Sequence, residues 1–262
     1  MARQRLGQHF LSGPGWQKRI LDTLPRGSEE VWIEIGPGHG EMTRMLAARG
    51  RRLIAIEADP RLAANLQEAV RAQPGEWPGV EVVSGDVLEL DLAKLAGGRF
   101  RVYGNLPYYI TSPILHQLFN RADQISSIHV VMQLEVAERV VAAPGCREYG
   151  YLSAACQFYT RPKLALRIPP GAFHPPPKVK SALVQMALPG EGASLGVADE
   201  AKFLKFIQLC FSHKRKTLRN NLLTIASDQR IHEILASCGL RPDARAEQLS
   251  LTHFAALFAA IA

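Results

Sequence analysis

The stretch VWIEIGPGHGE, residues 31–41, determines the fold class. A run of mostly apolar, β-branched residues ends in glycines at 36, 38 and 40, and a helical pattern begins at Glu41. A buried strand, a glycine turn and a helix in this order are typical of the first unit of a nucleotide-binding α/β fold. The glycines let the backbone pass close to a ligand, and the first amides of the following helix attract an anion.

Apolar runs and helical patterns alternate on the C-terminal side of this stretch. Buried strands are predicted at 31–36, 52–59, 80–87, 100–105 and 126–134, with helical patterns at 41–50 and 60–73. Strands separated by helices predict a parallel sheet with helices on both faces. The two strand-like runs at 163–170 and 181–188, with only a proline-rich loop between them, predict an antiparallel edge pair. We therefore expect a Rossmann-like sheet of seven strands.

The pattern changes after this pair. The segment 189–200 is rich in glycine and small residues and is typical of a linker, and the chain beyond it is helical. We expect two domains, a ligand-binding α/β domain at 1–189 and a small all-α domain at 190–262.

Composition limits the function classes. The chain has 262 residues, a net charge of +7 and four scattered cysteines without metal-ligand spacing, so we expect neither a disulfide framework nor a metal site. No apolar run has the roughly 20 residues that span a bilayer, and the N-terminal segment lacks a signal-peptide core. We expect a cytoplasmic protein. The positive charge favours a polyanionic partner such as nucleic acid.

The glycine loop has two ligand interpretations. Glu57 lies 21 residues after Gly36, where a carboxylate can accept hydrogen bonds from a ribose diol. A dinucleotide site needs G-x-G-x-x-G, but this loop has Glu41 in place of the third glycine. The E-x-G-x-G-x-G form, led by Glu34, better suits S-adenosylmethionine, whose ammonium prefers acceptors. A glycine turn without a ligand is the remaining alternative.

Asp86 follows the third predicted strand, at the edge where open α/β sheets bind ligands. Its carboxylate can accept a hydrogen bond from an adenine amine. A single Asp after a strand is more often a turn or cap residue. Its position in register with the glycine loop and Glu57 favours a cofactor contact.

The fourth strand ends in Asn105-Leu106-Pro107-Tyr108. The amine of a nucleobase is a poor nucleophile because its lone pair is delocalised into the ring. The Asn105 side-chain oxygen and the Leu106 carbonyl can accept its N–H groups, while Pro107 stiffens the turn and Tyr108 offers a face for stacking. The alternative is a structural turn covered by a tyrosine.

At this point the sequence resembles the KsgA/RsmA-type 16S rRNA adenine N6-dimethyltransferases over nearly its whole length. The motifs that carry the resemblance are GQHFL (7–11), EIGPGHG (34–40), IEAD (56–59), SGDVLELDL (84–92), NLPYYITSPIL (105–115), EYGYLS (148–153), FHPPPKVKSALV (173–184) and HKRKTLRNNL (213–222). It implies a Rossmann-like methyltransferase that uses S-adenosylmethionine to dimethylate N6 of two adjacent adenosines in the 3′-terminal hairpin of 16S rRNA. The implied setting is small-subunit biogenesis, with the small ribosomal subunit as partner and the enzyme as a monomer.

The resemblance also implies roles for individual residues. Cofactor contacts are implied at His9, Leu11, Gly36, Gly38, Glu57, Asp86 and Asn105, and the reaction site at Asn105, Leu106, Pro107, Tyr108 and Phe173. Phe173 would form the second wall around the flipped adenine, opposite Tyr108; its position in the sequence alone indicates core packing. Such enzymes often have Asn where this chain has His9, so a side-chain contact there would change character and a backbone contact would survive.

A basic cluster in the helical C-terminal part comprises His213, Lys214, Arg215, Lys216 and Arg219. Charges of this kind usually form a solvated helix face. Beside a base-modifying domain we interpret Lys214, Arg215, Lys216 and Arg219 as phosphate contacts that dock rRNA.

Three other functions share this pattern. One is a 23S rRNA adenine N6-methyltransferase of the erythromycin-resistance type, although the motif HKRKTLRNNL and the segment F-H-P-P-P-K favour the small-subunit enzyme. A mitochondrial transcription-factor relative would normally carry a transit extension, which is not seen here. A ribosome-assembly factor whose methylation is secondary is the third alternative.

Overall fold

The computed structural model describes residues 9–26, 30–49, 52–213 and 216–261. The chain divides into two compact units. Unit 1 comprises residues 1–137 and 162–188, and unit 2 comprises residues 138–161 and 189–262. The chain therefore enters unit 2, returns to unit 1 and enters unit 2 again.

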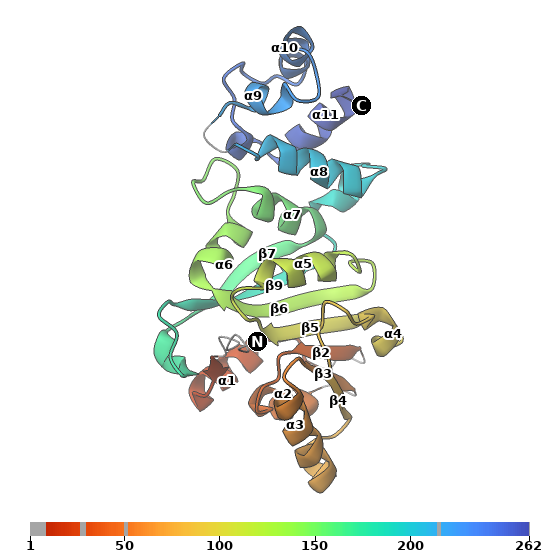
Figure 1. The fold of residues 1–262 in the computed structure, drawn as a ribbon, viewed down its shortest axis with the longest axis vertical. Helices are drawn as coiled ribbons and strands as arrows, with labels where there is room; N and C mark the ends of the chain where they lie inside the picture. Colours follow the sequence, from red (N-terminus) through yellow and green to blue (C-terminus); the bar gives the residue numbers. More distant parts are fainter. Residues whose placement is uncertain (1–8, 27–29, 50–51, 214–215, 262) are drawn as a thin grey trace, which may run out of the picture. The chain divides into compact units, whose positions relative to one another are not determined.

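Unit 1 is built on a seven-stranded sheet in the order β4-β3-β2-β5-β6-β9-β7 (Figure 1). Its strands are β2 (Val31–Ile35), β3 (Leu53–Glu57), β4 (Val80–Ser84), β5 (Phe100–Asn105), β6 (Ile125–Gln133), β7 (Arg161–Ile168) and β9 (Ser181–Ala187). The five strands from β4 to β6 are parallel, and β9 runs antiparallel to β6. The prediction of a mainly parallel Rossmann-like sheet of seven strands is confirmed.

Four helices connect the parallel strands in the described chain: α2 (Glu41–Ala47), α3 (Pro60–Ala72), α4 (Leu92–Ala96) and α5 (Thr111–Phe119). The helix α1 (Pro14–Thr23) precedes β2, and α6 (Leu134–Val141) follows β6 and crosses into unit 2. The start of α3 is fixed locally, because the Asp59 carboxylate accepts a hydrogen bond from the Arg61 amide and Pro60 takes the first helical position. Short 3₁₀ turns lie at Pro74–Glu76 and Pro170–Ala172.

The register of the strands places a mixed row of side chains on one face of the sheet. Glu34 pairs with Tyr103, Tyr103 with His129, and Val131 with Leu183. Since side chains alternate along a strand, Trp32, Tyr103, Val131 and Leu183 share this face. They pack in one buried cluster with residues of α1 and α2. This cluster holds the strand that precedes the glycine turn.

A second, two-stranded sheet joins distant parts of unit 1. In it β1 (Phe10–Leu11) pairs antiparallel with β8 (Phe173–His174), so that Phe10 faces His174 and Leu11 faces Phe173. The amides of Ser12 and Gly13 both donate to the Ala172 carbonyl and extend the connection. The predicted N-terminal segment is thereby tied to the proline-rich loop before β9.

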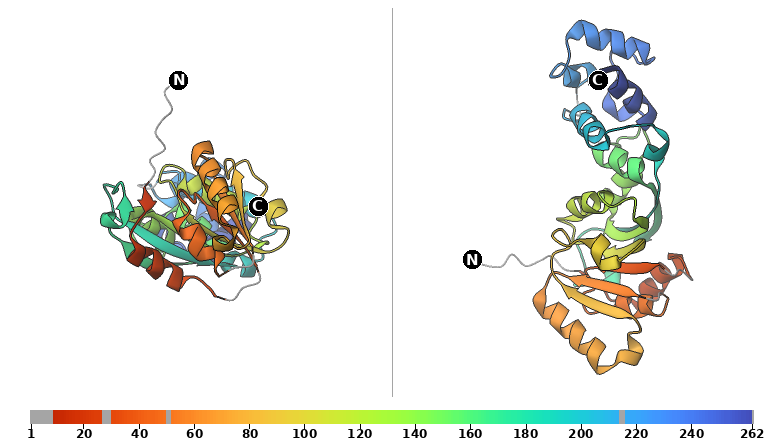
Figure 2. Two further views of the ribbon diagram at one scale, coloured as in Figure 1. Left: turned by 90° about the horizontal axis from the view of Figure 1, so that it is seen from below. Right: turned by 90° about the vertical axis from the view of Figure 1, so that its right-hand side faces the viewer.

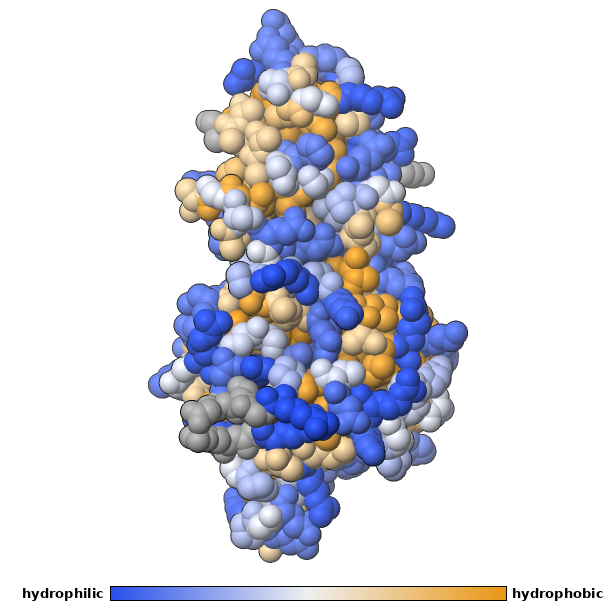
Figure 3. Space-filling view, turned by 180° about the vertical axis from the view of Figure 1, so that it is seen from behind, coloured by the Kyte–Doolittle hydropathy of each residue, from blue (hydrophilic) through white to orange (hydrophobic). Residues whose placement is uncertain are grey.

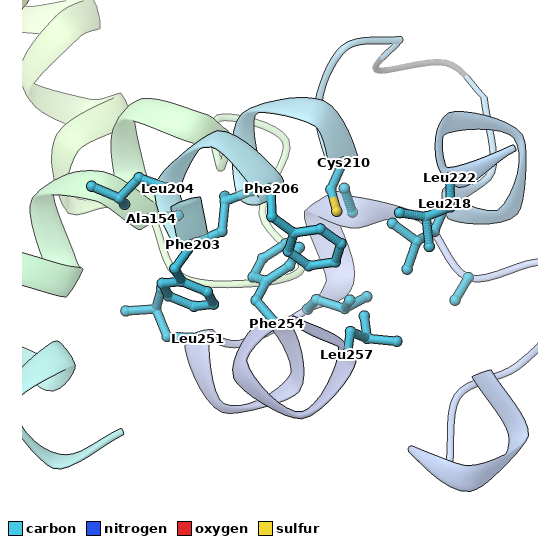
Figure 4. Close-up of a cluster of buried hydrophobic side chains, with 14 of the residues drawn as sticks. Ala154, Phe203, Leu204, Phe206, Cys210, Leu218, Leu222, Leu251, Phe254 and Leu257 are labelled. Carbon is cyan, nitrogen blue, oxygen red and sulfur yellow. The ribbon is translucent and has the colours of Figure 1, made fainter. Parts of the chain in front are cut away.

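Unit 2 contains α7 (Tyr151–Tyr159), α8 (Glu200–Cys210), α9 (Leu218–Leu222), α10 (Asp228–Ser237) and α11 (Leu251–Ile261), with 3₁₀ turns at Glu191–Ser194 and Ala246–Gln248. Figure 2 shows these helices in the two further views. Their apolar faces meet in one cluster in which Phe203 and Phe254 are fully buried (Figure 4). Ala154 and Phe158 of α7 belong to the same cluster.

The boundary between the units differs from the expected one in one segment. The chain crosses between Leu188 and Pro189, one residue before the expected boundary, and residues 138–161 lie in unit 2 and not with the sheet. The physical reason is the apolar face of α7, which packs into the helical cluster. The expected linker at 189–200 also packs against the end of α7. The Gly190 amide donates to the Tyr159 carbonyl at 2.8 Å, and the approach is so close that a Cβ on Gly190 would lie 2.3 Å from the Thr160 amide nitrogen.

The surface mixes polar and apolar residues on the face shown in Figure 3. Four large hydrophobic residues are exposed in the described part of the chain, Tyr109 and Val179 in unit 1 and Leu223 and Ile225 in unit 2. In this part of the chain no helix is long and apolar enough to cross a membrane.

Candidate active site

A cavity opens at the carboxyl edge of the parallel strands. It is lined by His9, Phe10, Gly36, Gly38, Glu57, Asn105, Leu106, Pro107 and Tyr108. The glycine turn after β2, the end of β3 and the loop after β5 thus meet at one place, as the parallel strand order requires. Eight of these nine residues were predicted as site residues from the sequence or the resemblance. Phe10 lies beside them in the lining and was not predicted.

The Glu57 side chain is hydrogen-bonded to the glycine turn. Its carboxylate accepts one hydrogen bond from the Gly38 amide and one from the Asp59 amide, both at 3.0 Å. Glu57 is only 4% exposed. A carboxylate oxygen has a second lone pair, so both contacts leave capacity for a ligand hydroxyl in the cavity.

The glycine turn is closed by Phe10 of β1. Gly38 has φ +60°, and a Cβ there would approach the Phe10 ring to 2.7 Å. Both the backbone conformation and this close approach require glycine at position 38. The approach places Phe10 of the N-terminal strand against the glycine turn.

A second hollow shares Phe10, Gly36 and Asn105 with the first and is also lined by Leu11, Glu34, Glu41 and Tyr103, among others. Glu34 Oε2 and the Tyr103 hydroxyl are buried here without a hydrogen-bond partner among the described residues. Burial, with repulsion from Glu41 and Glu57, raises the pKa of the Glu34 carboxyl to about 8. Unpaired buried acceptors favour a ligand with a cationic N–H group, such as the amino-acid part of S-adenosylmethionine.

Asn105 is oriented by the N-terminal segment. Its Nδ2 donates to the His9 carbonyl at 2.8 Å. Because this contact fixes which end of the amide is the donor, Asn105 Oδ1 is the atom left to accept a hydrogen bond from a substrate amine. His9 contributes here through its backbone, so its difference from the Asn common in such enzymes leaves this contact unchanged.

The His9 ring has separate contacts. Its Nδ1 lies 2.7 Å from the Pro175 carbonyl, and its ring lies 5.7 Å from that of Tyr108. Sequence reasoning did not find that His9 links Asn105, Tyr108 and the proline-rich loop. The backbone contacts leave no signal in residue identity, and the pairing of β1 with β8 joins positions more than 160 residues apart.

The loop after β5 presents the remaining reaction-site residues. The Leu106 amide donates to the Val131 carbonyl at the end of β6, and the Pro107 carbonyl accepts from the Ile110 amide at 3.2 Å. The Tyr108 hydroxyl lies 2.7 Å from Ser181 Oγ. Tyr108 therefore lines the cavity, and the contact of its hydroxyl with Ser181 fixes the orientation of its ring.

Asp86 and Phe173 lie outside the lining of this cavity. The exposed Asp86 follows β4 at the predicted edge, and its Oδ1 accepts a hydrogen bond from the Leu88 amide at 2.9 Å. Phe173 is buried, only 3% exposed, in the cluster beneath the sheet face. Their predicted contacts with adenine groups stay predictions.

Of the basic cluster, His213 and Lys216 lie between α8 and α9, and Arg219 lies in α9. Lys214 and Arg215 fall outside the described residues. Lys216 is exposed, and Arg219 forms a two-point ion pair with Asp228, with N–O distances of 2.5 and 2.6 Å. A phosphate contact by Arg219 would have to share or replace this pair. Within the described chain no group of His, Cys, Asp or Glu has the arrangement of a metal site.

Comparisons with known proteins agree with this geometry. The family model described as "Ribosomal RNA adenine dimethylase" matches residues 1–262. The proteins named "Ribosomal RNA small subunit methyltransferase A" of Geobacter metallireducens and Acidobacterium capsulatum are 40% and 41% identical; the alignments cover 98% of this chain and 94% and 90% of theirs.

Solved structures show the same fold. A dimethyladenosine transferase from Plasmodium falciparum has a TM-score of 0.77 at 22% identity, covering 95% of this chain and 96% of that one. The 23S rRNA methyltransferase ErmE has a TM-score of 0.74 at 26% identity, covering 96% and 99%. With the family model matched along its whole length and relatives near 40% identity, the chain belongs to the ribosomal RNA adenine dimethylase family.

Proposed function

We propose that this protein transfers methyl groups from S-adenosylmethionine to N6 of two adjacent adenosines in the 3′-terminal hairpin of 16S rRNA. The proposed setting is assembly of the small ribosomal subunit in the cytoplasm. The observation that carries the proposal is the orientation of Asn105, whose Nδ2 is occupied by the His9 carbonyl while the side chain lines a cavity beside the glycine turn. This leaves one acceptor for an amine at the reacting position.

The residues of the chain would divide the reaction as follows. Asn105 Oδ1 and the Leu106 carbonyl accept the two N–H groups of the adenine amine, and Tyr108 stacks on the ring. The nitrogen lone pair then forms a bond to the methyl carbon as the carbon–sulfur bond breaks, and the methylated amine loses a proton to water. S-Adenosylmethionine supplies the methyl group on a positively charged sulfur. No general base is needed.

The cofactor contacts form the second part of the proposal. Gly36, Gly38 and Leu11 would surround the cofactor's amino-acid end, Glu57 would accept its ribose hydroxyls and Asp86 its adenine amine. Phe173 would complete the wall opposite Tyr108 and therefore has to gain exposure when the base enters. Each of these groups comes from one chain, which supports action as a monomer.

The small helical part, residues 190–262, would dock the folded rRNA. Lys216 is exposed and Arg219 lies on the next helix, and Lys214 and Arg215 complete the proposed phosphate contacts. The sequence relatives carry the name of a small-subunit enzyme, which supports the small subunit over 23S rRNA. It likewise supports an enzyme over a factor that only binds.

The test is methylation of purified ribosomal particles. Small subunits that lack the modification are incubated with the protein and S-adenosylmethionine, and digested rRNA is analysed for N6,N6-dimethyladenosine by mass spectrometry. We expect product at two adjacent adenosines near the 3′ end. Product on 23S rRNA with none on small subunits would refute the assignment, and binding without any product would favour the assembly factor.

A further inference from the structure

Two exposed hydrophobic residues lie on different loops. Tyr109 follows Tyr108 and is 60% exposed, and Val179 precedes Ser181 by two residues and is 44% exposed. Single exposed hydrophobic residues are common on protein surfaces. These two, however, account for every large exposed hydrophobic residue in the described part of unit 1, and both lie within two residues of the contact between Tyr108 and Ser181.

The two loops are fastened to each other. The Tyr108 hydroxyl and Ser181 Oγ are 2.7 Å apart, and Ser181 is fully buried. The Leu134 amide also donates to the Lys180 carbonyl, which anchors the second loop to the end of β6. Tyr109 and Val179 therefore lie one and two residues from the contact between Tyr108 and Ser181. We name Tyr109, Val179 and the two lysines that flank Val179 the rim.

Neighbouring tyrosines in the loop have opposite environments. Tyr108 is half-buried, lines the cavity and lies 5.7 Å from the His9 ring, whereas Tyr109 has no ring contact or hydrogen bond from its side chain among the described residues. Tyr108 is therefore part of the cavity wall, whereas the ring of Tyr109 is accessible to a ligand.

The charge around the rim selects the ligand. Lys178 and Lys180 flank Val179, both are exposed, and neither forms an ion pair with the described residues. An open aromatic face next to unpaired cations is the arrangement that binds single-stranded nucleic acid, through base stacking and phosphate contact. Stacking of this kind tolerates any base.

We propose that the rim binds the RNA nucleotide adjacent to the target adenosine, with its base on Tyr109 and Val179 and its phosphates near Lys178 and Lys180. This inference rests on the proposed function for the identity of the target base. When one base enters the cavity beside Tyr108, the chain brings its neighbour to the surface that Tyr109 occupies. Tyr109 would hold the strand in place after the target base leaves its stack.

Direct stacking is testable without methyl transfer. A short single-stranded RNA carries the fluorescent base 2-aminopurine next to one adenosine and is titrated with protein in saturating S-adenosylhomocysteine. We expect the wild type and Tyr109→Phe to quench the emission at saturation. Tyr109→Ala should leave it unquenched and bind the RNA about tenfold to a hundredfold more weakly.

A matched control is Gln73→Ala, an exposed change after the end of α3, at the opposite edge of the sheet. It should behave as the wild type. On small subunits Tyr109→Ala should raise KM with kcat within about threefold of the wild type, and cofactor affinity should not change.

The outcomes separate the two proposals. If Tyr109→Ala quenches the 2-aminopurine emission and binds RNA as the wild type does, the proposal for the rim is wrong, even when the enzyme methylates small subunits. If the wild type methylates no RNA but binding still depends on an aromatic residue at 109, the proposed function is wrong and the rim stands. Loss of quenching in Gln73→Ala as well would show a nonspecific effect and overturn the assignment to Tyr109.

Discussion

Glu57 on the cofactor side of the cavity bonds to amides 19 and 2 residues away, whereas Asn105 and Tyr108 on the base side bond to partners 96 and 73 residues away. The cofactor side is a local product of the first two strands and the turns that follow them. The base side exists only when the N-terminal segment and the proline-rich loop have joined the sheet. We therefore expect the two sides to respond differently to substitution.

The largest expected effect is on the base side. Asn105→Ala removes the acceptor for the adenine amine and should lower kcat by about 10²–10³-fold, the usual effect of losing one oriented group at a reaction centre. Methyl transfer to small subunits measures kcat, and calorimetry measures cofactor affinity, which should stay within about threefold. Full activity in this variant would contradict the assigned role of Asn105 Oδ1.

On the cofactor side, Glu57→Gln replaces one of two acceptor oxygens with an N–H group that faces a backbone amide. Leaving a buried donor unpaired costs about 1–3 kcal/mol, so cofactor binding should weaken about tenfold to a hundredfold while kcat at saturating cofactor changes little. Asp59→Asn is the control, because it removes a neighbouring charge but keeps the helix cap. Equal losses in both variants would indicate a charge effect and not the bonds to Gly38 and Asp59.

A substitution of Glu34 tests whether its unpaired carboxyl in the second hollow serves to bind a ligand. Burial raises the pKa of its carboxyl to about 8, so the folded state binds the proton more tightly than the unfolded state. Stability must then fall as pH rises from about 4.5 to 8. Glu34→Gln should match the wild type in free energy of unfolding near pH 4 and exceed it by about 4 kcal/mol at pH 8.

Denaturant titrations at several pH values check this, provided no cofactor is present. Parallel pH profiles for the two proteins would mean that Glu34 does not lose a proton over this range. Adding the cofactor should reverse the order of stability at pH 8, since the glutamine cannot offer a charged acceptor to an ammonium group.

The smallest effect is expected for the bond between Tyr108 and Ser181. Tyr108→Phe and Ser181→Ala each remove one hydroxyl and should lower kcat/KM about two- to tenfold, in line with a net hydrogen-bond contribution near 1 kcal/mol. The double variant should lose no more than either single variant, because both remove the same bond. Additive losses in kcat/KM would show that the two hydroxyls act independently.

Much of the cofactor side could be predicted from the sequence. Apolar, β-branched runs in the sequence indicate the buried strands. The spacing of the glycines at 36, 38 and 40 and of Glu57 predicts the cofactor loop. Phe173 and Asp86 show where this reasoning stops. Asp86 follows β4 and Phe173 lies in the short strand β8, which was predicted as a loop. Their side-chain contacts depend on packing and on a bound ligand.

The base side and the division into units could be predicted only in part. Nothing in residues 7–11 indicates that the His9 carbonyl accepts a hydrogen bond from Asn105 Nδ2, since a backbone contact does not constrain the side chain. The helix α7 has an apolar face that predicts burial but not which core will bury it. Likewise, the pair of Arg219 with Asp228 joins residues nine positions apart across a turn between two helices.

The pairing of β1 with β8 has a practical consequence for handling the protein. A single proteolytic cut between Ser12 and Gly13 would leave all seven strands of the main sheet and the helical core in place. Once residues 1–12 had dissociated, such a product would elute and scatter light much like the intact protein, yet its Asn105 would have lost the His9 carbonyl. Intact mass, and not evidence of folding, is therefore the criterion by which an enzyme preparation of this kind should be accepted.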